Sequence, residues 1–235
     1  AKMNNFKDDQ LISMAVDGET FGHHKHFTER TIAFLLSEYA ETCGYKVVNY
    51  GEYLALHEPE YEVMLNEGNR GEGTSWSCIH GVGRWKRNCG CHTGGHENWN
   101  QRWRRHLRNA FNHLNGKLGV LYELEGKKYF KNVWSARNDY INILLNESRK
   151  EFFAEHSVKR LSKSETERAI ELLEMQKHAM LMFTSCGWFF SDISGIESIK
   201  VLEFANRAIE LGERISGISL LEEFLDELEK AKSNR

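Results

Sequence analysis

The chain has 235 residues, of which 40% are hydrophobic and 28% charged. This composition supports a folded core and excludes a disordered tail, while the single proline, Pro59, excludes a polyproline or collagen-like segment. The net charge of −3 is unevenly distributed, because residues 84–108 carry seven basic side chains and one acidic one. The longest nearly apolar stretch, residues 179–190, is too short to cross a bilayer, so we expect no membrane contact and predict a buried core helix there.

The N-terminus and the cysteines bear on the compartment. Residues 2–10 are polar and carry both signs of charge, which does not fit a secretion signal. The five cysteines are an odd number, and three of them cluster between positions 78 and 91. Reduced thiols in a cytoplasmic chain fit this usage better than a secreted disulfide scaffold.

The first 65 residues show an α/β pattern. Leu11–Val16 is almost continuously apolar and predicts a covered strand that stops at Asp17. Apolar positions at helical spacing follow from Thr28 to Cys43, and residues 45–50 predict a second short strand. Strand, helix and strand with short connections indicate an α/β unit.

The rest of the chain divides at about residue 97. Residues 66–97 contain eight glycines without sustained periodicity, which predicts a long functional or otherwise fastened loop. A helix is expected from Asn98 to Gly116, and Ser-x-x-Glu patterns mark at least three helices after residue 160. Residues 98–235 are therefore predicted to form a helical bundle. The inner face of the first helix is expected to consist of Trp99, Trp103, Leu107, Ala110, Phe111 and Leu114.

The turn after the first predicted strand reads Asp17-Gly18-Glu19-Thr20-Phe21-Gly22-His23-His24. A carboxylate at a strand end can face the mouth of an α/β barrel, and the glycines allow a tight turn close to a ligand. The alternative is an acidic turn that caps the following helix, since Asp-Gly is a common turn pair.

Asp17-Gly18-Glu19-x-Phe21-Gly22 resembles the motif near the last barrel strand of glycoside hydrolase family 57, whose members cleave or rearrange α-glucans. Residues 75–82 and 184–192 are similar to a subgroup of uncharacterised proteins, in which a family 57-like barrel continues into a domain of unknown function. The resemblance also includes Tyr53-Leu54, Ser75-Trp76 and Gly187-Trp188.

The resemblance implies a retaining α-glucan hydrolase or glucanotransferase in which Asp17 is the general acid/base. The family's nucleophile is a glutamate on an earlier barrel strand, and only 16 residues precede Asp17. Glu19 is a poor substitute, because it cannot face Asp17 across a sugar. We therefore expect a C-terminal fragment of an incomplete (β/α) barrel, inactive alone, which associates with the upstream barrel segment or another copy and needs no cofactor for its chemistry.

Further residues are candidates for binding the oligosaccharide or α-glucan. Histidines beside the turn can hydrogen-bond sugar hydroxyls, and tryptophan faces pack against pyranose rings. The alternatives are exposed loop histidines, core tryptophans and an aspartate that interacts with a helix N-terminus. The predicted substrate-binding residues are Glu19, His23, His24, Trp76, Trp188 and Asp192.

The glycine-rich loop carries a second constellation, Cys78-x-His80 followed by Cys89-x-Cys91. Three thiols and an imidazole are a suitable ligand set for a tetrahedral structural zinc ion. The spacing departs from the usual Cys-x-x-Cys knuckle, so small buried cysteines and a surface histidine are the competing interpretation. This constellation supports an alternative function, namely a non-catalytic, zinc-stabilised interaction or regulatory module.

The segment from Trp85 to Arg108 combines arginines with tryptophans, a composition found in grooves for single-stranded nucleic acid. We expect Trp99 and Trp103 in the core instead, with Arg104, Arg105 and Arg108 forming a solvated or acid-paired face. No nucleic-acid-binding motif accompanies these residues, so nucleic acid is the least favoured partner.

Overall fold

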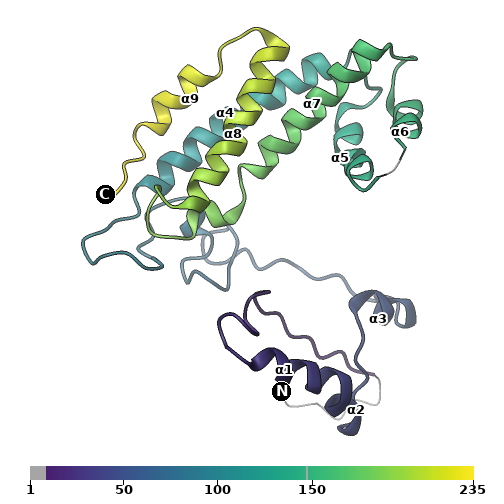
Figure 1. Ribbon diagram of the computed structural model, residues 1–235, viewed down its shortest axis with the longest axis vertical. Coiled ribbons are helices and arrows are strands. Elements are labelled where there is room, and N and C mark those ends of the chain that lie inside the picture. Colours follow the sequence, from purple (N-terminus) through teal and green to yellow (C-terminus); the bar gives the residue numbers. More distant parts are fainter. Residues whose placement is uncertain (1–8, 147) are drawn as a thin grey trace. The chain divides into compact units, whose positions relative to one another are not determined.

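The computed structural model describes residues 9–146 and 148–235. The chain divides into two compact units, Ala1–Met64 and Leu65–Arg235 (Figure 1). Both are helical, and within the described residues the only β pairings are isolated bridges, Phe21 with Lys25 and Phe130 with Ser157. None of the described helices combines the length and apolar character that crossing a membrane requires.

The described part of the N-terminal unit contains one interrupted helix and one short helix. Helix α1 (Thr28–Phe34) continues into the π-helical turn η1 (Leu35–Tyr39) and α2 (Ala40–Thr42). Gly44 then adopts a φ of 81°, a left-handed conformation that favours glycine after a helix. The helix predicted between residues 28 and 43 is therefore present. Helix α3 (Tyr50–Leu56) follows, and the Asn49 side chain caps it by accepting a hydrogen bond from the Glu52 backbone N–H.

The two predicted strands are wrong for this structure. Leu11–Val16 is not part of a sheet, and residues 45–49 are irregular before α3 begins. A strand needs a neighbouring strand to accept and donate its backbone hydrogen bonds. The described part of the N-terminal unit supplies no such neighbour, so the incomplete (β/α) barrel expected for residues 1–65 is not confirmed.

The N-terminal unit also lacks a core of its own among its described residues. Ala40 is the only one of them that is buried. Large apolar side chains on both the extended segment and the interrupted helix are exposed, among them Leu11, Met14, Phe34 and Leu36. The described part of this unit therefore contains many apolar side chains but does not bury them.

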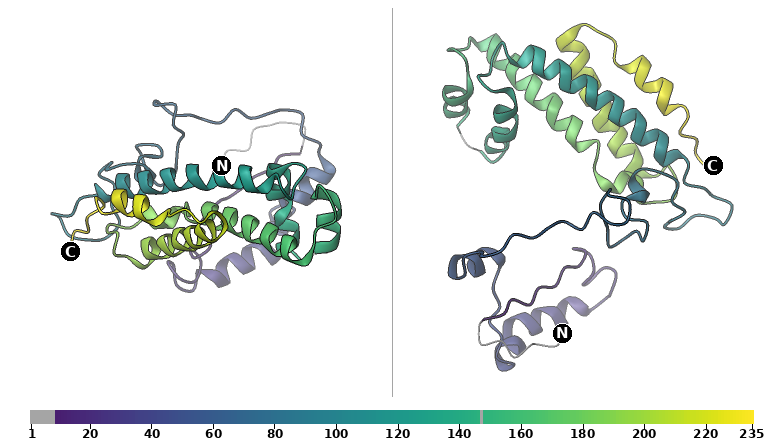
Figure 2. Two further views of the ribbon diagram at one scale, coloured as in Figure 1. Left: turned by 90° about the horizontal axis from the view of Figure 1, so that it is seen from above. Right: turned by 180° about the vertical axis from the view of Figure 1, so that it is seen from behind.

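The C-terminal unit is a helical bundle, as predicted for residues 98–235. Three long helices pack together: α4 (Trp103–Gly126), α7 (Lys163–Leu181) and α8 (Ile196–Ser216). Helix α9 (Leu221–Leu228) runs back along α4, as Figures 1 and 2 show. The shorter helices α5 (Val133–Leu144) and α6 (Arg149–His156) pack together at one end of α4 and α7.

The bundle buries one continuous apolar core. The expected inner face of α4 is confirmed for five of its six positions, all fully buried: Trp103, Leu107, Ala110, Phe111 and Leu114. The helix begins at Trp103 rather than Asn98 and passes through Gly116 to Gly126. It continues because Leu118 and Tyr122 extend the buried face beyond the glycine, and burial outweighs the low helix propensity of glycine.

The apolar stretch 179–190 is not one helix. Helix α7 ends at Leu181, and a short 3-10 helix η3 (Ser185–Trp188) follows. The Thr184 hydroxyl donates to the Leu181 carbonyl at 2.6 Å, and Gly187 packs against Val201 of α8. The chain thus turns at Thr184 and directs Trp188 into the core.

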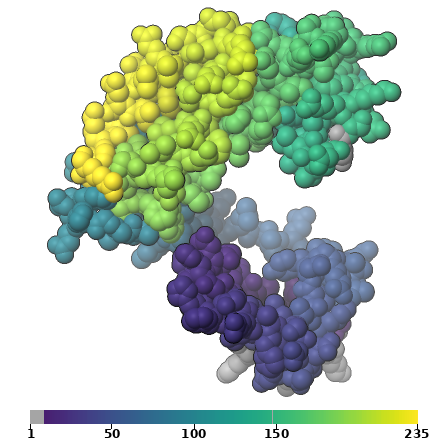
Figure 3. Space-filling model, in the orientation of Figure 1, coloured from purple at the N-terminus to yellow at the C-terminus, as the bar shows by residue number. Residues whose placement is uncertain are grey.

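In the space-filling view, α8 and α9 form a continuous surface of the bundle (Figure 3).

Candidate metal centre

The loop predicted at residues 66–97 has no helix or strand except η2 (Gly83–Trp85). Two glycines shape it around the cysteines. Gly81 has a φ of 70°, and a Cβ there would meet the Gly73 carbonyl oxygen at 2.6 Å. Gly90, with a φ of 85°, turns the chain between two cysteines. A left-handed backbone conformation is accessible mainly to glycine, so glycine is favoured at both positions.

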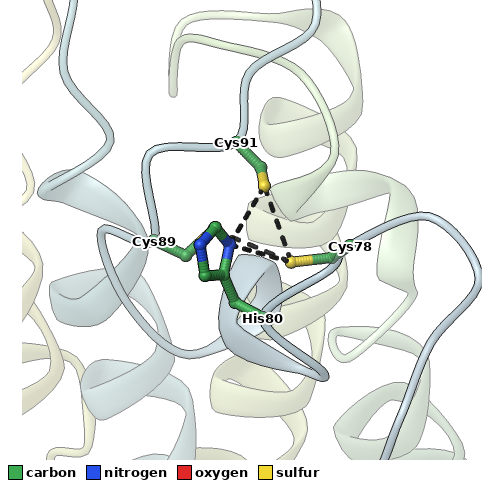
Figure 4. Close-up of side chains that lie close together, drawn as sticks. All are labelled: Cys78, His80, Cys89 and Cys91. Atoms are coloured by element: carbon green, nitrogen blue, oxygen red, sulfur yellow. Dashed lines mark hydrogen bonds between the residues drawn. The ribbon is translucent and has the colours of Figure 1, made fainter.

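The loop brings together the four residues predicted as metal ligands (Figure 4). Their ligand atoms all lie within 4.8 Å of one another. The Cys78 Sγ atom is 3.9 Å from Cys89 Sγ and 3.8 Å from Cys91 Sγ. The His80 Nδ1 atom is 3.3 Å from Cys91 Sγ and 3.9 Å from Cys78 Sγ.

The two sulfur–sulfur separations of 3.8 and 3.9 Å are close to the edges of a tetrahedral zinc site. Zn–S bonds of about 2.3 Å and Zn–N bonds of about 2.1 Å place ligand atoms roughly 3.6 to 3.8 Å apart. A disulfide would need sulfur atoms about 2.05 Å apart. All five cysteines of the chain are free thiols. The cluster therefore has the donor set and the dimensions for a divalent metal such as zinc.

The thiols of the cluster differ in acidity. Burial raises the pKa of Cys78, but hydrogen bonds from the backbone N–H groups of His80 and Arg84 outweigh it and bring the pKa to about 7. Burial raises the pKa of Cys91 to about 11, and the hydrogen bond to Cys78 and the charge of Cys89 add to this effect. Because a metal binds thiolates, metal binding here must release protons.

The loop is fastened to the bundle just after the cluster. The Ser191 hydroxyl accepts a hydrogen bond from the Thr93 N–H at 3.0 Å, and the carbonyls of Thr93 and Gly94 each lie 2.8 Å from it as acceptors. Within the loop, Arg87 forms a two-pronged ion pair with Glu72, which brings the pKa of Glu72 to about 2. The loop is thus tied to the bundle after the cluster and crosslinked to itself by the ion pair.

The carboxylate turn lies in the N-terminal unit. Asp17, Glu19, His23 and His24 are all exposed. The Glu19 carboxylate lies 3.7 Å from His24 Nε2, and the Asp17 carbonyl accepts the Thr20 N–H at 3.0 Å. The turn brings these four residues into one local segment, without a regular strand before it.

The other predicted substrate-binding residues lie apart from one another in the C-terminal unit. Trp76 is 85% exposed on the loop. Trp188 is 0% exposed, and its indole N–H donates to the Arg104 carbonyl at 3.1 Å, so it is a core residue with no face for a sugar. Asp192 is buried and accepts hydrogen bonds from Ser233 and from the Asn234 backbone N–H.

Asp192 lies beside a cavity of about 510 Å³ that the sequence analysis did not anticipate. Trp99 also lines this cavity, although helical periodicity placed it in the core. It precedes the first residue of α4, so it is not held to the buried face of that helix. Its ring lies edge-to-face with His96, 5.2 Å between centroids. The other lining residues include Thr93, Phe190, Glu197 and Arg235.

The basic segment differs from the expected solvated face. Arg104 is fully buried, and Arg108 is half-buried with its guanidinium 4.1 Å from the Trp188 ring centroid. Only Arg105 of the three is exposed. Burial of Arg104 and Arg108 within the domain weakens the case for a phosphate-binding stripe, which needs accessible cations.

Comparison with known proteins gives a family but no activity. Residues 99–235 match the family model described as a domain of unknown function, DUF3536. No curated protein and no solved structure matches the chain. The matched segment is more than half of the sequence. It covers the helical bundle and begins at Trp99, which lines the cavity. The chain therefore belongs to the DUF3536 family.

Proposed function

We propose that Cys78, His80, Cys89 and Cys91 bind one structural zinc ion, and that the chain acts as a zinc-stabilised helical module. The observation that carries the proposal is the convergence of three sulfur atoms and one imidazole nitrogen within 4.8 Å. A loop with almost no secondary structure gains few backbone hydrogen bonds, so a metal that crosslinks it contributes directly to its folding. On this proposal the zinc ion holds the loop against the helical bundle.

Metal analysis of the purified chain tests this proposal. We expect one zinc ion per chain, lost in Cys91→Ser and kept in Cys186→Ser, because Cys186 is an exposed free thiol outside the cluster. Cobalt substitution should give the sulfur-to-cobalt absorption of thiolate ligation. Absence of metal from the wild-type chain, or equal zinc content in both variants, would contradict the proposal.

The pH dependence of zinc binding gives a second test. Because the raised pKa keeps the Cys91 thiol protonated at neutral pH, zinc must displace its proton. We expect zinc affinity to increase as the pH rises and protons to be released on binding. Titration calorimetry in buffers of different ionisation enthalpy measures that release, and binding without proton release would exclude coordination by the thiols.

The second candidate function is that the chain forms part of a protein that acts on α-glucans. Two observations support it. The match to a domain of unknown function over residues 99–235 agrees with the subgroup resemblance, in which such a domain follows a family 57-like barrel. The cavity beside Trp99 combines an indole with the carboxylate of Glu197, groups that suit a sugar ring and its hydroxyls. On this proposal Asp17 is the acid/base, and the nucleophile comes from an upstream barrel.

Two experiments address this candidate. Maltooligosaccharide titration of the chain should show weak binding that Trp99→Ala removes and Trp76→Ala, an exposed tryptophan on the loop, leaves intact. In a glucan-active protein that also contains the upstream barrel, Asp17→Asn should abolish turnover. Activity that survives this change, together with no oligosaccharide affinity, would leave the zinc-stabilised module as the function.

A further inference from the structure

Two buried guanidinium groups lie beside the metal cluster. Arg104, in the first turn of α4, is 0% exposed, and its Nη1 donates to the Cys91 carbonyl at 2.6 Å. Its Nη2 donates to the carbonyls of Phe189 and Phe190 at 3.2 and 3.0 Å. The side chain therefore connects the backbone of one metal ligand to the segment that follows η3.

Arg84, from η2, completes the arrangement. It is also buried, and its Nη1 donates to the Phe189 carbonyl at 3.2 Å and to the Thr93 hydroxyl at 3.1 Å. Its guanidinium lies 4.3 Å from the centroid of the Phe189 ring. Arg84 and Arg104 share the Phe189 carbonyl as acceptor, so two like charges lie next to each other in the interior.

These charges have no carboxylate partner within the described ranges. The ion pairs found in the described part of the C-terminal unit involve other cations, and the loop carboxylate of Glu72 pairs with Arg87 and Lys86. The acceptors found for Arg84 and Arg104 are neutral carbonyl and hydroxyl oxygens, and the Nε atoms of both have no hydrogen-bond partner. A buried charge is strongly unfavourable unless an opposite charge compensates it.

The thiols of the cluster are the acidic groups next to both arginines. Arg104 donates to the carbonyl of Cys91, and the Arg84 backbone N–H donates to the sulfur of Cys78. Three thiolates, a neutral imidazole and Zn²⁺ carry a net charge of −1. A loaded centre is therefore an anion next to two cations that lack another counter-charge.

We propose that Arg104, assisted by Arg84, is the positioning residue of the metal centre and compensates the negative charge of the zinc–thiolate complex. This inference rests on the proposed zinc site and extends it from the ligands to the helical bundle. Arg104 holds the Cys91 backbone in place and supplies positive charge at the same point. Loss of either function weakens the metal centre without removing a ligand.

Zinc competition titrations on the full chain test the proposal. Removal of groups outside the ligand set typically lowers metal affinity about 10- to 100-fold, and we expect a loss in this range for Arg104→Met. Arg104→Lys, which keeps the charge but not the planar fork, should recover part of the affinity. Arg105→Met is the matched control, since Arg105 is the next residue of α4 and is exposed.

Alkylation of the zinc-loaded chain by iodoacetamide separates charge compensation from a purely structural role. A positive neighbour reduces the nucleophilicity of metal-bound thiolates, so Arg104→Met should be alkylated faster than the wild type at equal zinc occupancy. Arg104→Lys should react at nearly the wild-type rate. Because iodoacetamide is neutral, its local concentration does not change with the charge of the site.

The outcomes are distinguishable. If the wild-type chain binds no zinc, the proposed function fails before the arginines are tested. If the wild type binds zinc and folded Arg104→Met binds it equally tightly with an unchanged alkylation rate, the present inference alone is overturned. Should Arg104→Met lose its helical circular dichroism, Arg84→Met decides, because Arg84 lies in the loop; unchanged zinc affinity and alkylation there overturn the inference.

Discussion

The two units of the chain contain the same kinds of apolar side chain but differ in what covers them. In the C-terminal unit, α4, α7 and α8 bury a continuous core that includes Trp103, Phe111 and Trp188. In the described part of the N-terminal unit, Ala40 alone is buried, and aromatic and aliphatic side chains face outward. Apolar content therefore gives a core only where facing elements of matching shape are present.

The largest expected effect comes from removing a ring in the core. Trp188→Ala deletes an indole that lies edge-to-face with Phe111, with the ring centroids 5.5 Å apart, and should lower the free energy of unfolding by about 3 to 5 kcal/mol. Urea denaturation followed by circular dichroism measures it. Trp76→Ala is the control at an exposed position and should change the value by less than about 0.5 kcal/mol. Equal effects would mean that the bundle does not depend on this core.

A smaller effect is expected from overpacking beside the same ring. In Gly187→Ala the new Cβ would lie 2.6 Å from Val201 Cγ2, and the clash should destabilise the bundle by about 1 to 3 kcal/mol. Thermal unfolding measures the loss. Adding Val201→Ala should recover part of it, because it removes the atoms in contact. If the double variant is less stable than the two single effects combined, the close approach is not the cause.

Asp192 should show a pH-dependent contribution. Burial raises its pKa, but hydrogen bonds from Ser194, Asn234 and Ser233 outweigh this and hold the pKa well below its usual range. Its stabilising contribution is therefore fully present above the ordinary pKa of 3.8 and is lost as the pH falls below it. Asp192→Asn should cost about 1 kcal/mol at pH 7. Wild type and variant should converge in stability at low pH, as paired melts would measure; a constant difference would exclude the ionised carboxylate as the cause.

The smallest effect should come from the N-terminal unit. Phe34 is exposed at the end of α1, so Phe34→Ser should change the unfolding free energy by less than about 0.5 kcal/mol. Phe111→Ser, the same replacement in the bundle, provides the contrast and should be severely destabilising. Denaturation of the two variants side by side checks the comparison. A large loss for Phe34→Ser would show that the unit has a core after all.

The bundle was the most predictable part of the fold. Helical periodicity identified the buried face of α4 from Trp103 to Leu114, because a long amphipathic pattern constrains both type and orientation. The strand predicted at Leu11–Val16 was wrong because a short, almost continuously apolar run carries no period that distinguishes a strand from an uncovered segment. Helix ends were less predictable, since α4 begins at Trp103 rather than at Asn98.

The candidate site was predictable where its residues are neighbours in sequence. Cys78, His80, Cys89 and Cys91 are metal-binding residue types confined to one loop, and the structure brings them together. Arg104 could not be recognised, because its burial depends on carbonyls of Phe189 and Phe190 that are remote in sequence. Trp99 was misplaced because periodicity was extended beyond the true start of α4.

The proposed ligands are close together in the sequence, whereas the groups that hold Arg104 are remote from it. This difference affects the order in which the site forms during synthesis. All four ligands lie between residues 78 and 91, so bringing them together closes only a short loop, at a small loss of chain entropy. The carbonyls that hold Arg104 belong to residues 189 and 190, which leave the ribosome much later. On the proposed zinc site, the nascent chain can thus bind the metal before the residues that hold Arg104 have been synthesised.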